Sequence, residues 1–432
     1  MKRKIYDRLL EWKRRDAPRY ALMIDGARRV GKSYIAEEFA KAEYEAYVLI
    51  DFSKVKKDVK ELFEDYLDEL DTFFMLLQNK LNVVLPRGKS LIIFDEVQRF
   101  PRAREAIKHL VKDGRYHYLE TGSLISINRN AKDILLPSEE LRVKMHPMDF
   151  EEFLWAMDKD ILSENIREHF STNEKMPESL HNQALDLYQK YLIVGGMPES
   201  VLKYQQTQSY LASREIQQSI LAGYDKDMTK YSSPATAVKI RACFNSIPAQ
   251  LAKENRKFQY KLAKKGGTAT IFGEAIQWLM QSGVAAKCTL VSHGYLPLSA
   301  QVDDSDFKIY LADVGLLGAK AQIPASMLLN CIEVDNTFLG SVAENYVAQQ
   351  LQALNHSLFY WKNDNTAELE FVLQIEDNII PTEVKKGRRV KAQSMTQFME
   401  KYKTPLAYRI SGKNFGLANG VKAIPLYAVF CI

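Results

Sequence analysis

The chain has 432 residues, a length that predicts about two to four domains because one domain usually takes about 100–200 residues. Hydrophobic residues make up 46% and charged residues 26%, which excludes a disordered or low-complexity chain and leaves an ordinary globular one. The formal net charge of +5 neither requires nor excludes a nucleic-acid partner.

Cysteine usage and hydropathy indicate the compartment. The four cysteines lie far apart and form no C-x-x-C pair, which is typical of thiols in a reducing compartment and not of a disulfide framework or a zinc site. No stretch approaches the roughly eighteen consecutive apolar residues of a membrane-spanning helix, and the basic N-terminus lacks the apolar centre of a signal peptide. We therefore expect a cytoplasmic protein with no membrane partner.

The N-terminal stretch MKRKIYDRLLEWKRR predicts an amphipathic helix. Ile5, Leu9, Leu10 and Trp12 recur near helical spacing. We expect the helix to pack on the domain that follows, and binding to a membrane surface is the alternative.

The strongest motif follows at residues 20–34. It matches G-x-x-x-x-G-K-[ST] in full, with an apolar strand, ALMID, before it and an expected helix, SYIAEEFAKA, after it. In that setting, glycines let backbone N–H groups point at phosphate oxygens, and the helix N-terminus faces the phosphates. An ordinary glycine turn is the alternative. The candidate nucleotide-binding residues are Gly26, Ala27, Arg28, Arg29, Val30, Gly31, Lys32, Ser33 and Tyr34.

Lys32 and Ser33 have defined roles in such a loop. Lys32 would reach the β- and γ-phosphates of ATP, and Ser33 would offer its hydroxyl to Mg²⁺. ATP and Mg²⁺ are therefore the predicted cofactors.

A second strand of catalytic type is expected in SLIIFDEVQRFP. Four apolar residues, 91–94, end in Asp95-Glu96, and the carboxylates should emerge at the C-terminal edge of a parallel sheet, where ligands bind. Asp95 would hold Mg²⁺, and Glu96 would polarise the attacking water as general base. Residues 45–53 predict a further strand, and 55–82 and 102–112 predict helices.

Three further residues are candidates for assisting hydrolysis. Thr121 and Ser123 end the expected strand RYHYLETGSLIS, between the two motif strands, where a side chain could touch the γ-phosphate or the water. Hydrogen bonds within a turn are the alternative for both. Arg142 could neutralise transition-state charge in its own subunit or a neighbour, or it could be an ordinary surface arginine.

These motifs give the chain a specific resemblance. It resembles the prokaryotic AAA-type ATPases that carry a C-terminal domain of unknown function. The segments that carry the resemblance span nearly the whole chain; they are LLEWKRR, GARRVGKS, IIFDEVQRFP, LETGS, LRVKMHPMDFEEFL, YLIVGGMPE, FKIYLADVGLLGA, GSVAENYVAQQL, FYWKND, AELEFVL and IIPTEVKKG. The resemblance implies ATP binding and hydrolysis, with the biological task unassigned.

We expect an α/β protein of three domains. A P-loop NTPase domain with a parallel sheet would occupy residues 1–199, a helical and winged-helix-like domain residues 200–330, and a restriction-endonuclease-like α/β domain residues 331–432. We interpret Gly195-Gly196 as a hinge between the first two.

The middle domain carries a basic cluster. Residues 258–290 read as helix, turn, helix and strand, an order that resembles a winged-helix module. The cluster is a candidate contact for DNA phosphates, and a solvated flank of a protein-docking module is the alternative. Its members are Lys253, Arg256, Lys257, Lys261, Lys264 and Lys265.

The last segment resembles the restriction-endonuclease-like fold, whose signature is an acidic residue followed by a (D/E)-x-K strand. If Asp377-Asn378 makes a two-residue turn, Glu370 lies opposite Lys385, and both share a strand face with Glu383. The two carboxylates could hold Mg²⁺, Lys385 could stabilise the developing charge or orient water, and Glu344 could complete the cluster. The family usually has aspartate in place of Glu370, and a cross-strand ion pair is the alternative.

Three functions remain open from the sequence. The chain could be an ATP hydrolase that switches conformation, an ATP-regulated nuclease or DNA-binding protein, or a nucleotide-dependent interaction switch that cuts nothing. The sequence leaves its oligomeric state and the source of any arginine finger open.

Overall fold

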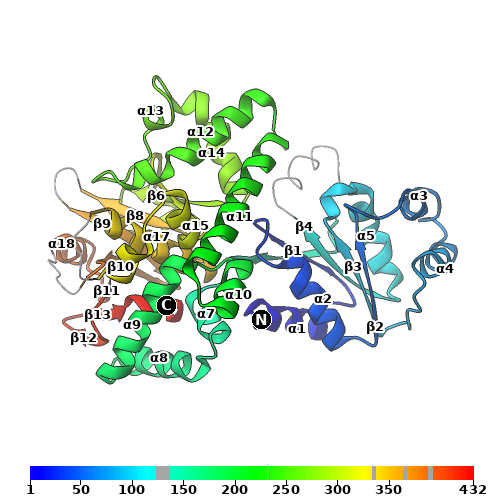
Figure 1. Ribbon diagram of the computed structural model, residues 1–432, viewed down its shortest axis with the longest axis horizontal. Helices are drawn as coiled ribbons and strands as arrows, with labels where there is room; N and C mark the ends of the chain where they lie inside the picture. The colour runs from blue at the N-terminus through cyan, green and yellow to red at the C-terminus, as the bar shows by residue number, and fades with distance from the viewer. Residues whose placement is uncertain (123–136, 231, 333–336, 364–366, 388–392) are drawn as a thin grey trace. The chain divides into compact units, whose positions relative to one another are not determined.

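The computed structural model describes all residues except 123–136, 231, 333–336, 364–366 and 388–392 (Figure 1). The described residues form two compact units, which we call the first unit, Lys2–Met145, and the second unit, His146–Ile432. Each unit contains one of the two sheets.

The first unit has the α/β architecture expected of a P-loop NTPase. Its five strands are all parallel and follow the order β2-β3-β4-β1-β5. Strands β1 and β3 are buried along their whole length, which explains their continuous apolar sequence. The elements are α1 Ile5–Arg15, β1 Ala21–Gly26, α2 Lys32–Glu43, β2 Ala46–Asp51, α3 Lys57–Asp65, α4 Leu70–Leu81, β3 Ser90–Asp95, the 3₁₀ turn η1 Val97–Arg99, α5 Pro101–Asp113, β4 His117–Gly122 and β5 Glu140–Met145.

The order of the strands positions the site. Strand β4 pairs with β1 on one side and with β3 on the other. The residues that end β4 therefore emerge between the phosphate loop and Asp95, as the sequence predicted. Strand β5, which the sequence did not predict, pairs with β1 and ends the sheet.

The N-terminal helix packs on the first unit, as predicted. Ile5, Leu9 and Trp12 of α1 are buried, and the Trp12 indole donates a hydrogen bond to the Tyr20 carbonyl at 2.9 Å. The Trp12 ring also contacts Phe39 of α2. The apolar stripe therefore faces protein.

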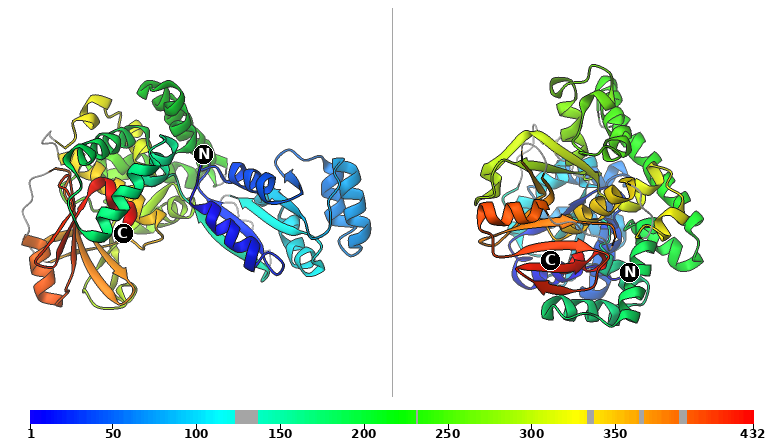
Figure 2. Two further views of the ribbon diagram at one scale, coloured as in Figure 1. Left: turned by 90° about the horizontal axis from the view of Figure 1, so that it is seen from below. Right: turned by 90° about the vertical axis from the view of Figure 1, so that its left-hand side faces the viewer.

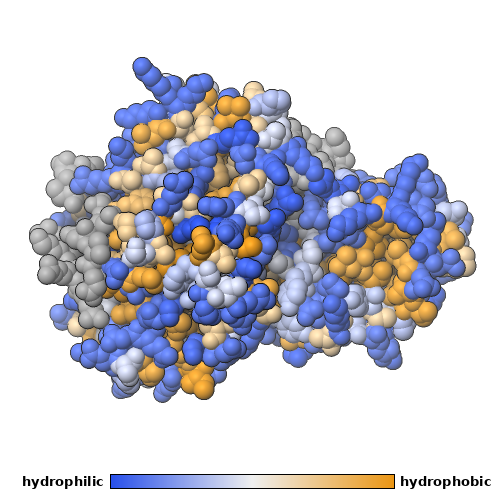
Figure 3. All heavy atoms as spheres, in the orientation of Figure 1, coloured by the Kyte–Doolittle hydropathy of each residue, from blue (hydrophilic) through white to orange (hydrophobic). Residues whose placement is uncertain are grey.

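Helices α3, α4 and α5 contribute to an aromatic core beside β2 and β3. Phe52, Phe63 and Phe94 form edge-to-face pairs at its centre. The predicted helix 55–82 is two helices, because the chain turns between Asp65 and Leu70. Met75 on α4 is exposed, and hydrophobic surface gathers over this part of the first unit in the view of Figure 3.

The second unit begins with helices and ends in a mixed sheet. Its helices pack around α9, α15 and α17. The helical elements are α7 Phe150–Ala156, α8 Asp160–Thr172, α9 Glu178–Val194, α10 Pro198–Thr207, α11 Tyr210–Lys230, α12 Pro234–Leu251, α13 Tyr260–Ala263, α14 Ala269–Gln281, η2 Leu298–Gln301, α15 Val314–Lys320, α16 Ala325–Leu329, α17 Thr337–Ala353, α18 Gln393–Tyr402 and η3 Leu426–Cys431.

The eight strands of the second unit form one sheet in the order β12-β13-β11-β10-β9-β8-β6-β7. Parallel pairing of β6 with β8 joins the expected middle domain to the expected C-terminal domain. The division into three domains therefore stays a prediction. The strand pairing in this sheet runs across the expected boundary between the second and third domains. The strands of this sheet are coloured from yellow-green to red in Figure 2. The strands are β6 Ala285–Val291, β7 Val302–Leu311, β8 Phe359–Lys362, β9 Glu368–Ile375, β10 Asn378–Val384, β11 Ala407–Ser411, β12 Gly416–Ala418 and β13 Val421–Pro425.

The predicted hinge at Gly195-Gly196 is wrong. A Cβ atom on Gly195 would collide with the carboxylate of Asp313, and one on Gly196 would collide with the carbonyl oxygen of Met148. The Gly196 N–H donates to Asp313 Oδ2 at 2.5 Å. The two glycines are needed because the backbones at Met148, at Gly195-Gly196 and at Gly315 approach closely, and this packing leaves no room for a Cβ atom.

Two remaining sequence features have a direct structural outcome. All four cysteines are free thiols, and Cys243, Cys288 and Cys331 are buried. Among the described helices, none is both long enough and apolar enough to cross a bilayer.

Candidate nucleotide site and C-terminal charge cluster

The phosphate loop joins the end of β1 to the start of α2. Gly26 has a φ of 151°, and a Cβ there would collide with the carbonyl oxygen of Met145, its partner on β5. Gly31 has a φ of 97°, in the left-handed region, and directly precedes the helix. Both glycines of the motif are thus required by backbone geometry.

The other predicted loop residues differ in exposure. Ala27 and Val30 are buried, and the Val30 carbonyl accepts a hydrogen bond from Arg3 Nη1 at 2.9 Å. Arg28 and Arg29 are exposed, and Tyr34 on α2 is about half exposed. Any contribution of this loop to phosphate binding therefore comes mainly from its backbone.

Lys32 lies inside the loop. Its ammonium donates to the carbonyl oxygens of Gly26 at 3.1 Å and Ala27 at 2.9 Å, and the residue is 7% exposed. Burial lowers the pKa of Lys32 to about 8, although the nearby carboxylates of Glu96 and Asp95 act in the opposite direction. The charge is therefore held where phosphate oxygens would compete with carbonyl oxygens for it.

Asp95 gathers the hydroxyl groups of two other elements. Ser33 Oγ donates to Asp95 Oδ1 at 2.7 Å, and Thr121 Oγ1 donates to the same oxygen. Asp95 itself is 6% exposed. An all-oxygen donor set with one carboxylate is what Mg²⁺ takes when it keeps several waters and substrate phosphates, so these residues fit that ion.

Glu96 occupies the turn that follows Asp95. It adopts a left-handed conformation, with φ of 53°, and its N–H approaches Thr121 Oγ1 at 3.4 Å. Its carboxylate accepts a hydrogen bond from the amide of Gln98 at 2.7 Å. The sequence analysis did not single out Gln98, although it stands in the quoted motif IIFDEVQRFP.

The remaining candidates have separate outcomes. Thr121 reaches the site as described, whereas Ser123 lies outside the described residues. Arg142 is on β5, and its Nε donates to Glu140 at 2.7 Å. Glu140 also accepts two bonds of 2.8 Å from Arg104 of α5. Arg142 is thus part of an ion-pair network, and its role as an arginine finger stays a prediction.

A buried carboxyl that the sequence analysis missed adjoins this network. Glu120 on β4 is fully buried, and burial, followed by the charge of Glu140, raises its pKa well above the usual range. The neutral form of Glu120 is favoured. No local pattern signals such a residue, because its charged neighbours come from two other elements, β5 and α5.

The C-terminal carboxylates come together as an ion-pair cluster. Lys385 Nζ lies 3.1 Å from Glu370 Oε1 and 3.4 Å from Glu383 Oε1. Glu370 also accepts the N–H of Val384, and Arg409 lies 3.3 Å from Glu383. The three predicted residues therefore share a face, as expected.

The register behind that face differs from the prediction. Ile375 pairs with Asn378, so the turn residues are Glu376 and Asp377, and not Asp377 and Asn378. Moving the turn by one position shifts the pairing by two residues, and Pro381 faces Val372. Because side chains alternate with a period of two, the strand faces are preserved while the predicted opposite pairs are wrong.

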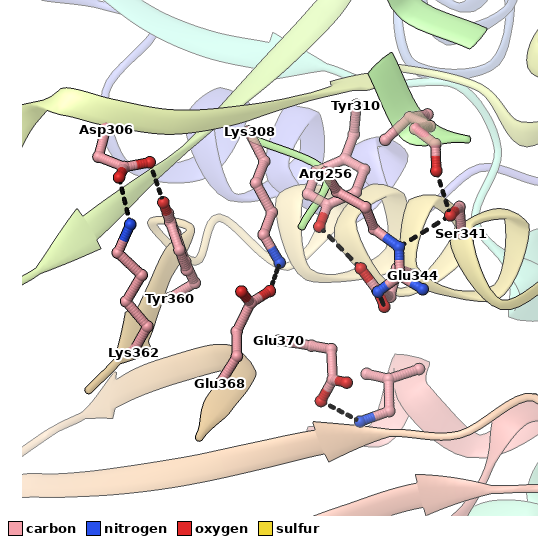
Figure 4. Close-up of polar contacts among 12 residues, drawn as sticks. Arg256, Asp306, Lys308, Tyr310, Ser341, Glu344, Tyr360, Lys362, Glu368 and Glu370 are labelled. Carbon is pink, nitrogen blue, oxygen red and sulfur yellow. Dashed lines mark hydrogen bonds and ion pairs between the residues drawn. The ribbon is translucent and has the colours of Figure 1, made fainter. Parts of the chain in front are cut away.

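Glu344 of α17 belongs to the adjoining part of this network (Figure 4). Its carboxylate accepts from Arg256 Nη1 and from the Tyr310 hydroxyl, the latter at 3.2 Å. Lys308, which is 0% exposed, pairs with Glu368. Among the described residues, no group of three or more His, Cys, Asp or Glu side chains is arranged to hold a metal ion.

An open pocket of about 1040 Å³ lies against this network. Residues of the loop after α12, of β6, of β8 and of β9 line it, and Arg256, Lys362 and Glu368 are among them. Each of these three has an ion-pair partner, since Lys362 pairs with Asp306. The charged groups of the pocket wall are therefore largely satisfied within the protein.

The basic cluster of the middle segment is smaller than the sequence indicated. Arg256 is used by Glu344, and Lys257 lies 2.7 Å from Asp306. Both are therefore engaged inside the protein and are unsuited to DNA phosphates. The exposed members are Lys253, Lys261, Lys264 and Lys265.

The helices, the turn between them and the hairpin of this segment are present, and the exposed Lys261, Lys264 and Lys265 lie on α13 and on the turn that follows it, not on the second helix, α14. The exposed residues of α14 are Ala269, Thr270, Ile271, Glu274 and Gln277, none of them a cation. The turn between β6 and β7 packs on α18, where Tyr295 contacts Tyr402 at a ring separation of 5.2 Å. Neither the second helix nor the hairpin thus offers positive charge to a DNA groove.

Comparison with known families agrees with the nucleotide site. Residues 18–154 match the family model of an AAA domain. Residues 185–326 match a domain of unknown function (DUF8612), and residues 339–429 match another (DUF4143). No curated protein matches the chain.

Solved structures give distant similarities. The Walker-type ATPase of Pyrococcus abyssi is 16% identical with a TM-score of 0.42, over 74% of this chain and 95% of that chain. AMPPCP-bound DnaA of Aquifex aeolicus is 13% identical with a TM-score of 0.26, over 65% of this chain and 88% of that chain. Drosophila ORC bound to DNA is 14% identical with a TM-score of 0.28, over 70% of this chain and 89% of that chain. Scores this low carry no argument about the function of this chain.

The family match and the site geometry agree on one class of protein. The matched segment contains the phosphate loop, Asp95, Glu96 and Thr121, and the fold brings these residues together. Residues 18–154 therefore form an AAA-type P-loop ATPase domain, and the protein is an ATPase.

Proposed function

We propose that the protein binds ATP with Mg²⁺ in the first unit and uses hydrolysis to change the conformation of the second unit. The observation that carries this proposal is the convergence of Ser33 and Thr121 on one oxygen of Asp95, beside the buried Lys32. Three elements far apart in the sequence supply these groups.

Each group has one role in this proposal. The loop N–H groups and Lys32 would hold the triphosphate, and Ser33 and Asp95 would hold Mg²⁺, which would supply neutralisation of phosphate charge. Glu96 accepts a proton from the attacking water. Thr121 responds to the presence of the γ-phosphate. Its hydroxyl donates to Asp95 and lies next to the N–H of Glu96, so a shift of either residue moves it.

The connection between the units supplies a route for the change. Gly26 of the phosphate loop pairs with Met145, the last residue of β5. Three residues later, Met148 donates its N–H to the Gly196 carbonyl at 2.7 Å, and its own carbonyl accepts from the Tyr191 hydroxyl at 2.5 Å. A shift of the loop would thus pull on a segment that is clamped in the second unit.

Two substitutions test this function. Lys32→Ala should abolish or severely weaken ATP binding, because the γ-phosphate loses its main cation. Glu96→Gln should bind ATP normally and hydrolyse it about 10²- to 10⁴-fold more slowly, because an amide keeps the shape and cannot accept the proton. Binding and steady-state turnover are measured with Mg²⁺ and with EDTA.

Lys41→Ala is the matched control, since Lys41 lies on the same helix and pairs only with exposed glutamates. This substitution should leave both ATP binding and steady-state turnover unchanged. Unchanged turnover in Glu96→Gln would remove Glu96 from the mechanism, and turnover in EDTA would remove Mg²⁺.

Action on nucleic acid is the second candidate function. The contact of Lys385 with both Glu370 and Glu383 favours it, because a metal-dependent nuclease of restriction-endonuclease type needs these groups on one face. If the segment cleaves DNA, Mg²⁺ or Mn²⁺ should support cleavage, and Lys385→Ala should abolish it without changing ATP turnover. Lys413→Ala, at an exposed position, is the control. Absence of cleavage with either metal would leave the residues as an ion-pair cluster.

A further inference from the structure

The turn that carries Glu96 is unusually well fixed. Glu96 is the first residue after β3 and adopts a left-handed conformation, which is uncommon for a residue with a Cβ. The Arg99 N–H donates to the Glu96 carbonyl at 2.8 Å and closes the 3₁₀ turn. Val97, at the start of that turn, is fully buried and packs with Met23 of β1.

This turn brings a buried amide back to the carboxylate. Gln98 is only 6% exposed, and its Nε2 donates to Glu96 Oε2 at 2.7 Å. A hydrogen bond to an ionised carboxylate is shorter and stronger than one between neutral groups. The backbone of Glu96 is held at the other end, where its N–H approaches Thr121 Oγ1.

We infer that Gln98 is a positioning residue for ATP hydrolysis, which sets the direction of the Glu96 carboxylate. This inference rests on the proposed role of Glu96 as general base. Gln98 donates to one carboxylate oxygen and leaves Oε1 to accept from the attacking water. A side-chain amide does not take up a proton in the physiological range, so Gln98 orients the base without competing with it.

The physical need for such a residue follows from the glutamate side chain. Its three rotatable bonds let the carboxylate swing through several ångströms, whereas a general base must stay within hydrogen-bond reach of its water. A displacement of about 1 Å at a reacting group can cost about 100-fold in rate. Because Gln98 is itself buried and stands on an anchored turn, it limits that swing.

The variant Gln98→Met tests the inference, because methionine keeps the length of the side chain and removes the donor. We expect kcat for ATP hydrolysis to fall by about 10- to 100-fold, with KM and the equilibrium affinity for ATP changed by less than about 3-fold. A purely structural defect would weaken ATP binding and the cooperativity of unfolding as well.

Gln78→Met is the matched control. Gln78 on α4 belongs to the same unit, and its half-buried amide also makes two hydrogen bonds, with the Phe74 carbonyl at 3.2 Å and the Leu85 N–H at 2.8 Å. Removing these bonds should leave kcat unchanged. A fall in kcat of equal size in Gln78→Met would assign the effect to general loosening and overturn the inference.

A double variant separates this inference from the proposed function. If Gln98 acts through Glu96, then Gln98→Met should cost nothing further in the Glu96→Gln background. Absence of ATP turnover in the wild type would overturn the proposed function, and full turnover in Glu96→Gln would remove Glu96 as general base and the positioning role of Gln98 with it. Slow turnover in Glu96→Gln with normal or raised kcat in Gln98→Met would overturn only the positioning role. An additive loss in the double variant would also overturn it.

Discussion

At the scale of single residues, the surroundings of Lys32 determine the pKa of its ammonium group. Burial removes water from the charge, and two carbonyl oxygens replace only part of that hydration. Its pKa of about 8 means that a sizeable fraction is neutral in mildly alkaline solution. A triphosphate in the loop adds negative charge beside Lys32 and so raises this pKa.

We therefore predict proton uptake when ATP binds above pH 8. Lys32 is charged below its pKa, so affinity should be constant near pH 7 and fall by up to about tenfold per unit as pH rises above 8. Calorimetry in two buffers of different ionisation enthalpy measures the uptake directly. Lys32→Arg, which stays charged, should bind without it, and an affinity independent of pH from 7.5 to 9.5 would contradict the prediction.

Gly195 is the residue of the second unit that should tolerate substitution least. Its φ is 71°, and a Cβ atom would collide with the Asp313 carboxylate and with the Gly315 backbone. We predict that Gly195→Ala lowers the free energy of unfolding by about 2–4 kcal/mol, from backbone strain and overpacking together. Urea unfolding followed by tryptophan fluorescence measures the loss.

Gly223→Ala is the control for this prediction. Gly223 lies within α11, where a Cβ would meet nothing within 4 Å, so alanine should stabilise the helix by about 0.5–1 kcal/mol. Equal effects of the two substitutions would show that the packing around Gly195 is looser than the structure indicates.

At the scale of elements, prediction from sequence succeeded where local pattern decides structure. The phosphate loop, the strand before Asp95, the N-terminal helix and the shared face of Glu370, Glu383 and Lys385 all depend on periodicity or on a short motif. A slip of the β9–β10 turn by one residue kept the strand faces because strand side chains alternate.

Prediction failed where distant segments decide the structure. Strand β5 is an exception, because its sequence ELRVKM alternates polar and apolar residues and carried a strand signal that was missed; its polar residues Glu140 and Arg142 form the ion-pair network with Arg104. The enclosure of Gly195 depends on Asp313, which is 118 positions further along the chain. A pair of glycines reads as a flexible joint from sequence, and only the packing shows that small size is the property being used.

The turn between α13 and α14 gives a prediction about nucleic acid. With Arg256 and Lys257 engaged in ion pairs, four exposed lysines of the basic cluster remain for DNA phosphates. The logarithm of DNA affinity should then fall against the logarithm of salt with a slope no steeper than about −3.6, or roughly −0.9 per phosphate. Replacing Lys261, Lys264 and Lys265 with glutamine should flatten the slope to about −0.9.

A matched triple replacement, Lys54, Lys56 and Lys57 to glutamine, removes equally exposed charges from the first unit. It should leave the slope unchanged. Equal flattening by both triples would assign binding to net charge alone, and undetectable binding at low salt would favour a protein partner for this turn.

At the scale of the whole molecule, the second unit is built as one packed body. The sheet runs from β7 to β12 through strands of both matched domains of unknown function. Ion pairs cross the same boundary, since Arg256 contacts Glu344 and Lys308 contacts Glu368. We therefore expect a conformational change in one of these domains to reach the other through the shared sheet.

The chain from the first unit enters this body near Met148, whose backbone is held by hydrogen bonds to Gly196 and Tyr191. We call these hydrogen bonds the Met148 clamp. The Tyr191 hydroxyl donates to the Met148 carbonyl and accepts from Gln349 Nε2 at 2.7 Å. Gln349 also accepts the N–H of Val314 at 2.9 Å, so the clamp reaches α15 and α17. Tyr346, beside it, has a buried hydroxyl with no hydrogen-bond partner among the described residues.

We predict that Tyr191→Phe uncouples the second unit from nucleotide. ATP affinity and turnover should stay within about 2-fold of wild type, because the site lies wholly in the first unit, and stability should fall by about 1–3 kcal/mol as buried groups lose their partner. In the Glu96→Gln protein, which holds ATP without hydrolysing it quickly, ATP should change hydrogen exchange at residues 191–196 and 313–316. Tyr191→Phe should abolish this change, whereas Tyr346→Phe, which removes an unused hydroxyl, should retain it. If ATP changes hydrogen exchange at these residues in none of the variants, then the Met145–Met148 segment does not couple the nucleotide site to the second unit.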